Sequence, residues 1–304
     1  MAVAEKVNKY KKKASASDNA SDGESTNTSS SRKRRERPIL SVEKFKPSEI
    51  FWHYPFLIYG AKKIGKTTLL SKFPKAYAFM FEPNDSYELY KSDITDWEDF
   101  KELVPQFLGG QHEFESCWID NGRNAYELAL NYVCRKAGVE HPSEIKDFGQ
   151  TWAKIYAELS LPVRQLMQSK FGFSVTCHEV EKEIETRTGR TFIQVAPDLS
   201  SAASRLFCGE IYNIFYYHYD GNDRFLQIVG DDYVMAGNRM KGHFLTTKGE
   251  RVARIPMGNS EEEAFENLIK AYNNKQTDAF VQNVKKEGKE GTAGTKFKKS
   301  KEKA

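Results

Sequence analysis

The sequence predicts an α/β fold with a mostly parallel central sheet and antiparallel hairpins at its edge, and three observations predict it. Four short apolar runs, each closed by a glycine or a polar residue, are typical of buried strands: residues 55–59, 76–81, 116–119 and 171–177. Segments with helical patterning lie between them, as when crossover helices join parallel strands. Two glycine-containing turns, at residues 188–190 and 220–221, then predict antiparallel hairpins.

Capping residues and proline predict where the helices of the first half begin and end. One helix is expected to begin at Thr67 and to stop at Phe73-Pro74, because proline cannot continue a helix. Residues 95–108 are predicted to be helical behind a Thr95 cap. A longer helix over residues 123–137 follows the third strand.

The second half adds helices and hairpins in alternation. A helix is predicted over residues 151–170 and should be interrupted at Pro162, since proline lacks the N–H that a helix interior needs. The fourth strand is expected to end at His178. A helix near residues 198–208 separates the two hairpins, and a final helix covers residues 260–274.

The charge distribution separates the chain into three parts. Residues 1–40 carry ten Lys and Arg against five Asp and Glu, and residues 284–304 carry eight Lys against three Glu, so each end has a net charge of +5. The chain total of +4 leaves −6 for the middle. Both ends lack apolar periodicity and are predicted to be disordered basic tails, with one folded domain over residues 41–283. Such tails either contact nucleic acid or another polyanion, or simply keep the protein in solution.

Cysteine usage and hydropathy predict the compartment. The four cysteines are widely spaced and form no C-x-x-C, which favours a reducing compartment over a zinc site or a disulfide scaffold. No stretch approaches 18 uninterrupted apolar residues, and the N-terminus lacks the apolar core of a secretory signal. We therefore expect a soluble cytoplasmic protein without a membrane partner.

A phosphate-binding motif follows the first strand. The stretch GAKKIGKT, residues 60–67, satisfies GxxxxGK[ST] at every fixed position, with a buried strand before it and a helix after it. Its glycines let successive backbone N–H groups face phosphates at a helix N-terminus. Lys66 would bridge the β- and γ-phosphates, and the Thr67 hydroxyl would hold Mg²⁺. The predicted nucleotide-binding residues are Gly60, Ala61, Lys62, Lys63, Ile64, Gly65, Lys66, Thr67 and Thr68.

Two carboxylates end the neighbouring strands. Asp120 closes the third apolar run, where a carboxylate can orient Mg²⁺ water; its alternative role is to cap the next helix. Glu82 closes the second run, where a parallel sheet would bring it beside the γ-phosphate to polarise water; the alternative is a surface glutamate before a proline turn.

The strand ends together resemble a known family. A P-loop followed by FMFEP, CWID and VTCHE resembles the RecA-fold ATPases. The stretch DFGQTWAKIYAEL is similar to a patch of the phage-encoded RecA-like ATP-binding proteins that act as single-strand annealing recombinases. The resemblance covers roughly residues 52–245.

This resemblance implies an ATPase that uses ATP and Mg²⁺. Lys66 and Thr67 would then bind phosphate and metal, Asp120 the metal, and Glu82 would be the catalytic base. His178 would be a sensor of the γ-phosphate, although on chemistry alone it could be a core histidine or half of a metal pair. The family often carries Lys-x-Arg as a finger for the neighbouring subunit; here Gly237 replaces the lysine and only Arg239, with Lys241 nearby, remains.

The resemblance also implies partners. Single-stranded DNA would be bound by a homo-oligomer, with a single-strand binding protein as a further candidate and, for a phage protein, the host bacterial cytoplasm as location. Candidate DNA contacts are Lys182, Arg187 and Arg190 after His178, and stacking by Trp152 or the Tyr216-Tyr217 pair. A nucleotide or small-molecule kinase and a nucleotide-gated adaptor of a phage replication complex remain as alternatives.

Overall fold

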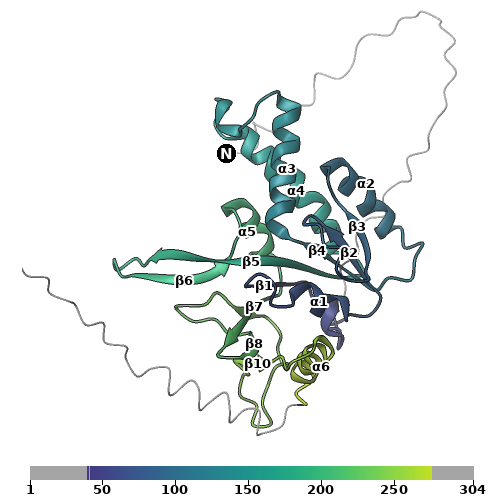
Figure 1. Ribbon diagram of the computed structural model, residues 1–304, viewed down its shortest axis with the longest axis vertical. Helices are drawn as coiled ribbons and strands as arrows, with labels where there is room; N and C mark the ends of the chain where they lie inside the picture. The colour runs from purple at the N-terminus through teal and green to yellow at the C-terminus, as the bar shows by residue number, and fades with distance from the viewer. Residues whose placement is uncertain (1–39, 41, 276–304) are drawn as a thin grey trace, which may run out of the picture. The chain divides into compact units, whose positions relative to one another are not determined.

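The central sheet of the computed structural model orders its strands β10-β8-β7-β1-β5-β4-β2-β3 (Figure 1). The structure describes residues 40 and 42–275, and a compact unit begins at Pro47. The strands of this path are β1 (Phe56–Gly60), β2 (Ala76–Met80), β3 (Tyr90–Asp93), β4 (Ser116–Asp120), β5 (Gly172–Glu185), β7 (Asn213–Asp220), β8 (Asp223–Gln227) and β10 (Arg254–Pro256). Neighbours from β7 to β3 pair in parallel, while β8 and β10 add antiparallel strands. The predicted fold class is confirmed.

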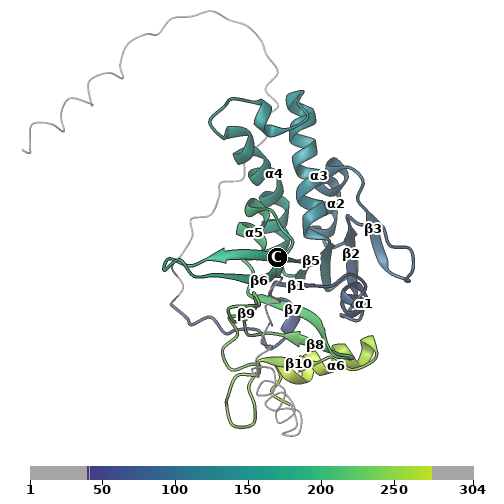
Figure 2. The same ribbon diagram turned by 60° about the vertical axis from the view of Figure 1, so that its left-hand side comes forward.

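Helices cover both faces of this sheet (Figures 1 and 2). On one face lie α1 (Lys66–Ser71) and α6 (Glu261–Tyr272); on the other lie α2 (Trp97–Leu108), α3 (Gly122–Ala137), α4 (Gln150–Met167) and α5 (Ser201–Phe207). Strand β1 is buried throughout because its alternating side chains enter two cores. Phe56 and Ile58 belong to the core under α1 and α6, and Leu57 and Tyr59 to the other. No helix in the described part of the chain is long and apolar enough to span a bilayer.

Helix α4 continues through Pro162 without a break, so the predicted interruption is wrong. Ile155 and Leu159 before the proline, and Val163 and Leu166 after it, are completely buried in one core. Packing of this apolar stripe outweighs the lost backbone hydrogen bond.

Two further differences concern polar segments. Helix α2 is capped by Asp96 rather than Thr95, since the Asp96 side chain accepts the Glu98 N–H at 2.9 Å. Strand β3 was not predicted, because YKSD lacks an apolar run; it pairs with β2 at the edge of the sheet. Short 3-10 helices at Phe51–His53 and Pro142–Glu144 complete the connections.

Strand β5 does not end at His178 as predicted but continues to Glu185. Its second half pairs antiparallel with β6 (Thr191–Pro197), which confirms the predicted hairpin at residues 188–190. We call residues 179–197 the ribbon; it extends away from the sheet in both views (Figures 1 and 2). The hairpin at residues 220–221 is confirmed by the antiparallel pairing of β7 and β8.

The described residues leave some predictions untested. The tails at residues 1–40 and 284–304 lie outside them, except for Leu40. The domain boundaries at residues 41 and 283 therefore stay predictions. A two-residue strand, β9 (Gly237–Asn238), pairs with the start of β7 just before Arg239.

Candidate nucleotide site

Parallel strands end at one edge of the sheet and bring the predicted functional residues together there. Gly60 at the end of β1 is in register with His178 in β5, and Met80 at the end of β2 is in register with Asp120 at the end of β4. Glu82 lies two residues beyond Met80. Because these strands share one direction, the P-loop, Glu82, Asp120 and His178 face the same crevice.

The two motif glycines are required by the shape of the P-loop. A Cβ atom on Gly60 would lie 1.9 Å from the Tyr217 carbonyl oxygen, so β1 and β7 could not keep their spacing with any other residue. Gly65 has a φ of +107°, a conformation that glycine adopts without strain. Ile64 is 1% exposed and anchors the loop in the core below. The loop backbone is thereby fixed at the N-terminus of α1.

Lys66 is nearly buried, with 7% of its surface exposed. Its ammonium donates hydrogen bonds to the carbonyls of Gly60 at 2.9 Å and Ala61 at 2.8 Å. Burial lowers the pKa of Lys66, and the nearby Asp120 carboxylate opposes that shift. A buried cation held by two carbonyls is a fixed positive centre for an anionic ligand.

Asp120 is held by two hydroxyls. Its Oδ2 accepts from Thr67 Oγ1 at 2.6 Å, and its Oδ1 accepts from Thr176 Oγ1 at 2.8 Å. Asp120 is 7% exposed and Thr176 is fully buried, so the bond to Thr176 is shielded from water, whereas the bond to the half-buried Thr67 borders the pocket. The capping role considered for Asp120 belongs instead to its neighbour Asn121, whose side chain accepts the Asn124 N–H at 3.0 Å.

Glu82 is bound by two side chains, His178 in β5 and Asn121 at the start of α3. Its Oε2 lies 3.1 Å from His178 Nε2 and also accepts a hydrogen bond from Asn121 Nδ2. Its backbone N–H donates to the Asp120 carbonyl at 3.0 Å. Glu82 is therefore not a loose surface glutamate, and the imidazole of His178 faces the pocket rather than the core.

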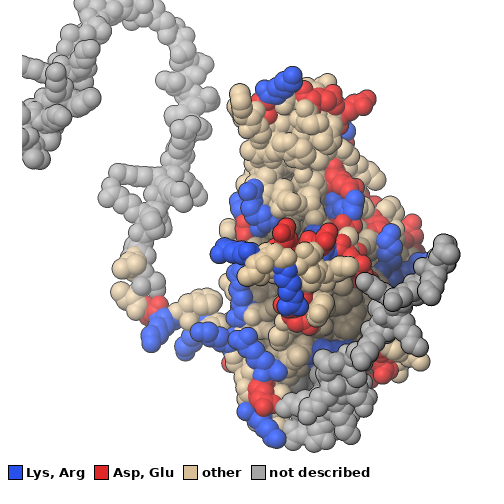
Figure 3. Space-filling view, turned by 90° about the vertical axis from the view of Figure 1, so that its left-hand side faces the viewer, with Lys and Arg blue, Asp and Glu red and all other residues tan. Residues whose placement is uncertain are grey.

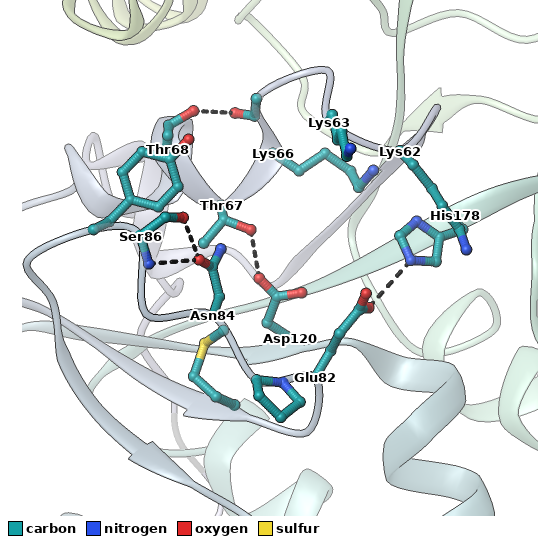
Figure 4. Close-up of a pocket in the computed structure, with 14 residues that line it drawn as sticks. Lys62, Lys63, Lys66, Thr67, Thr68, Glu82, Asn84, Ser86, Asp120 and His178 are labelled. Carbon is teal, nitrogen blue, oxygen red and sulfur yellow. Dashed lines mark hydrogen bonds and ion pairs between the residues drawn. The ribbon is translucent and has the colours of Figure 1, made fainter.

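A pocket of about 480 Å³ joins these groups, a size typical of small-ligand sites. Figure 4 shows the lysines of the P-loop on one side of it, with Glu82 and Asp120 facing them. Sequence reasoning missed the lining from the segment after Glu82, namely Pro83, Asn84, Ser86 and Tyr87. Tyr87 is 47% exposed, so its ring offers an open aromatic face. The sequence gave no signal for this lining, because an apolar run that ends at a Glu-Pro turn does not show where the following segment lies.

Arg239 lies away from this pocket. It follows β9, donates its backbone N–H to the Tyr212 carbonyl at 3.1 Å, and bonds the Gly209 carbonyl through its guanidinium at 3.1 Å. In β7, Asn213 is in register with the first residue of β1, whereas Tyr217 is in register with Gly60. Arg239 therefore lies at the opposite end of the parallel strands from its own P-loop.

The candidate DNA contacts are dispersed, and several are occupied. Lys182 Nζ donates to the Leu199 carbonyl at 3.4 Å, and Arg190 lies 3.8 Å from Asp232. Tyr217 is fully buried, and Tyr216 stacks between Tyr59 and His218 with ring centroids 5.0 and 4.7 Å away. Neither tyrosine can offer a free face to a base. Trp152, at the start of α4, is 42% exposed.

The residues present fit a nucleotide with Mg²⁺. A hydroxyl and a carboxylate, from Thr67 and Asp120, are the oxygen donors that Mg²⁺ prefers, and lysines at Lys62, Lys63 and Lys66 suit phosphates. Among the described residues, no three His, Cys, Asp or Glu side chains converge as metal ligands.

Fold and site together define a P-loop nucleotide-binding protein. A family model described as an AAA domain matches residues 53–240, more than half of the chain, and the chain belongs to this family. The match indicates an AAA-type P-loop ATPase fold, and members are generally ATPases that use ATP and Mg²⁺. The comparison with curated proteins gave no match.

Proposed function

We propose that the chain hydrolyses ATP at this pocket, with Glu82 as the base that polarises the attacking water. The observation that carries the proposal is the convergence of Lys66, Asp120 and the doubly held Glu82 carboxylate on one pocket. Lys66 would bind the β- and γ-phosphates, and His178 would report on the γ-phosphate through its contact with Glu82.

Mg²⁺ would be held by Thr67 and oriented by Asp120, and it would supply neutralisation of charge on the phosphate oxygens. The hydroxyl of Thr176 keeps Asp120 turned toward Thr67. Tyr87 would stack on the base of the nucleotide, because its exposed ring lines the same pocket.

We further propose that the protein binds single-stranded DNA and promotes annealing in phage recombination or replication. Support comes from the turn between α3 and α4 and the first residues of α4, where Phe148 is completely exposed and Trp152 is 42% exposed. Lys146 and Lys154 are exposed beside them. Aromatic faces flanked by lysines are the usual platform for unpaired bases and their phosphates. Figures 1 and 2 show this turn at the tip of a helical pair that rises from the sheet.

The test measures Mg²⁺-dependent ATP hydrolysis with and without single-stranded DNA. We expect DNA to stimulate hydrolysis, and Lys66→Ala to abolish ATP binding. Replacing both Phe148 and Trp152 by Ala should weaken DNA binding by roughly thirtyfold to 10⁴-fold, since base stacking contributes about 1–3 kcal/mol per base and two rings are removed. The control is Tyr233→Ala, which removes a 60% exposed aromatic elsewhere. Phosphate transfer to a small molecule would instead identify a kinase, and ATP binding without turnover would identify an adaptor.

A homo-oligomer would bring Arg239 to the nucleotide of a neighbouring copy. The placement of Arg239 far from its own P-loop supports this, because a finger in trans must lie on another face. A well-placed finger contributes roughly 10³–10⁵ in rate. Mixing Arg239→Ala with Glu82→Gln subunits should restore activity, since some interfaces then combine an intact base with an intact finger. A mixture as inactive as its parts contradicts the trans assignment. A single-strand binding protein is a candidate further partner.

A further inference from the structure

One buried amide connects the start of α3 to Glu82. Asn121 directly follows Asp120, is 2% exposed and caps α3 through its side-chain oxygen, which accepts the Asn124 N–H at 3.0 Å. The nitrogen of the same amide donates to Glu82 Oε2. A side chain needed only as a cap would use its oxygen alone, so the second bond calls for a separate explanation.

The main chain around Glu82 is fixed by the same short segment. The Glu82 N–H donates to the Asp120 carbonyl at 3.0 Å, and Asn124 Nδ2 donates to the Phe81 carbonyl at 3.1 Å. Both the backbone and the carboxylate of Glu82 are thus attached to residues 120–124. The Glu82 side chain is still 46% exposed, so without the bond from Asn121 its long chain would exchange among rotamers.

The two donors to Glu82 bind the same oxygen. His178 Nε2 and Asn121 Nδ2 both contact Oε2, and in the described part of the chain no side chain or N–H bonds to Oε1. Oε1 is therefore the oxygen left to accept a hydrogen bond from water. His178 can act as donor only in a tautomer with hydrogen on Nε2, whereas the Asn121 amide donates in every state.

We propose that Asn121 is a positioning residue for the hydrolytic reaction. By holding Oε2, it directs Oε1 of Glu82 toward the attacking water, and it couples that direction to the rigid start of α3. This inference rests on the proposed ATP hydrolysis. It assigns to Asn121 a role in turnover and none in nucleotide binding, which belongs to the P-loop.

Two substitutions separate positioning from capping. Asn121→Ser keeps a good capping oxygen but removes the amide N–H that reaches Glu82, because the serine side chain is shorter, and Asn121→Asp keeps the shape and the cap but sets a carboxylate against Oε2. We expect Asn121→Ser to lower kcat on the order of 10²-fold with little change in KM for ATP, because a misplaced catalytic group has about that effect. Asn121→Asp should lower kcat further. Asp96→Ser, which also replaces an N-cap residue by serine but at the start of α2, is the control and should leave kcat unchanged.

The outcomes distinguish this inference from the proposed function. If the unmodified protein does not hydrolyse ATP, the proposed function is wrong, and if Glu82→Gln hydrolyses ATP at the unmodified rate, the assignment of Glu82 as the base is wrong. If Glu82→Gln is inactive but Asn121→Ser turns over normally, only the positioning role is overturned. Where Asn121→Ser proves too unstable to assay, the isosteric Asn121→Asp decides, since a folded protein with full kcat overturns the role. In a Glu82→Gln background, Asn121→Ser should cause little additional loss, because the carboxylate that it positions is gone.

Discussion

Strand β5 passes through two environments, and His178 marks their boundary. From Gly172 to Cys177 it lies between parallel β1 and β4, and every residue is buried. From Glu179 to Glu185 it pairs only with β6, and from Glu181 onward exposed glutamates alternate with half-buried residues. The sequence shows this change. FGFSVTC is a continuous apolar run, typical of a strand in a sheet that is covered on both faces, whereas EVEKEIE alternates with a period of two, typical of a ribbon with one exposed face.

The proposed chemistry lies at the boundary between these halves. Hydrogen bonds between the buried half and β1 fix the position of the His178 backbone, because His178 is in register with Gly60. The pocket that His178 lines stays open to a ligand. The exposed half carries four glutamates on one side, at alternate positions from 179 to 185. Figure 3 shows acidic side chains mixed with basic ones on the face from which the ribbon projects. Substitution effects should therefore fall steeply across the boundary.

The largest expected effect is at the crevice. Glu82→Gln should keep ATP binding and lower turnover by roughly 10²–10⁴-fold, because the water loses its base. Glu183→Gln makes the same chemical change on the exposed side of the ribbon and should leave turnover unaltered. Nucleotide titration together with steady-state hydrolysis checks both. Equal effects of the two substitutions would erase the distinction between the crevice and the ribbon.

The next effect concerns stability. Phe173, in the buried half, is 1% exposed, and Phe173→Ala should destabilise the fold by about 3–5 kcal/mol through lost burial and a cavity. Ile193, on the ribbon, is 57% exposed, and Ile193→Ala should change stability by no more than about 0.5 kcal/mol. Urea denaturation measures both. A large loss at Ile193 would mean that the ribbon packs against something, such as a second copy.

Local signals explain which parts of the site could be predicted. The P-loop is a contiguous motif, and its flanking strand and helix follow from the adjacent letters. Glu82, Asp120 and His178 follow from one rule, that polar residues closing parallel strands meet at one edge. The rule succeeds here because the intervening helices leave no doubt about strand direction.

What could not be predicted depends on register and on loop shape. The hydroxyl of Thr176 reaches Asp120 only because β5 lies beside β4, which no local pattern indicates. In the sequence, Asn121 looks like any other helix cap. Its hydrogen bond to Glu82 could not be predicted, because the position of Glu82 relative to α3 is known only from the structure. The prediction that Pro162 interrupts its helix was wrong, because the packing of an apolar stripe outweighs the low helix propensity of proline.

A third prediction tests where DNA affinity originates. The chain ends carry +5 each and the middle carries −6, so the ends are the main source of attraction to a polyanion. Deleting residues 1–40 and 284–304 should weaken binding of single-stranded DNA. The dependence of log K on log salt should flatten by about 0.7 for each phosphate that the protein no longer neutralises. ATP hydrolysis without DNA should stay unchanged. Salt titrations of the truncated protein provide the measurement, and an unaltered slope would mean that the phosphate contacts come from the folded domain that also carries Phe148 and Trp152.

The smallest effect is expected at the tip of the ribbon. Arg187 is exposed and, within the described residues, forms no ion pair, whereas Lys182 and Arg190 already have partners. Arg187→Ala can therefore remove at most one phosphate contact, so the salt slope for single strands should fall by no more than about 0.7. The glutamates of the ribbon oppose phosphate approach, and Glu181→Gln should if anything strengthen binding slightly. If Arg187→Ala lowered the salt slope by the amount expected for several phosphates, the ribbon would be the main DNA contact. Both halves of β5 would then carry a functional surface, one for the nucleotide and one for DNA.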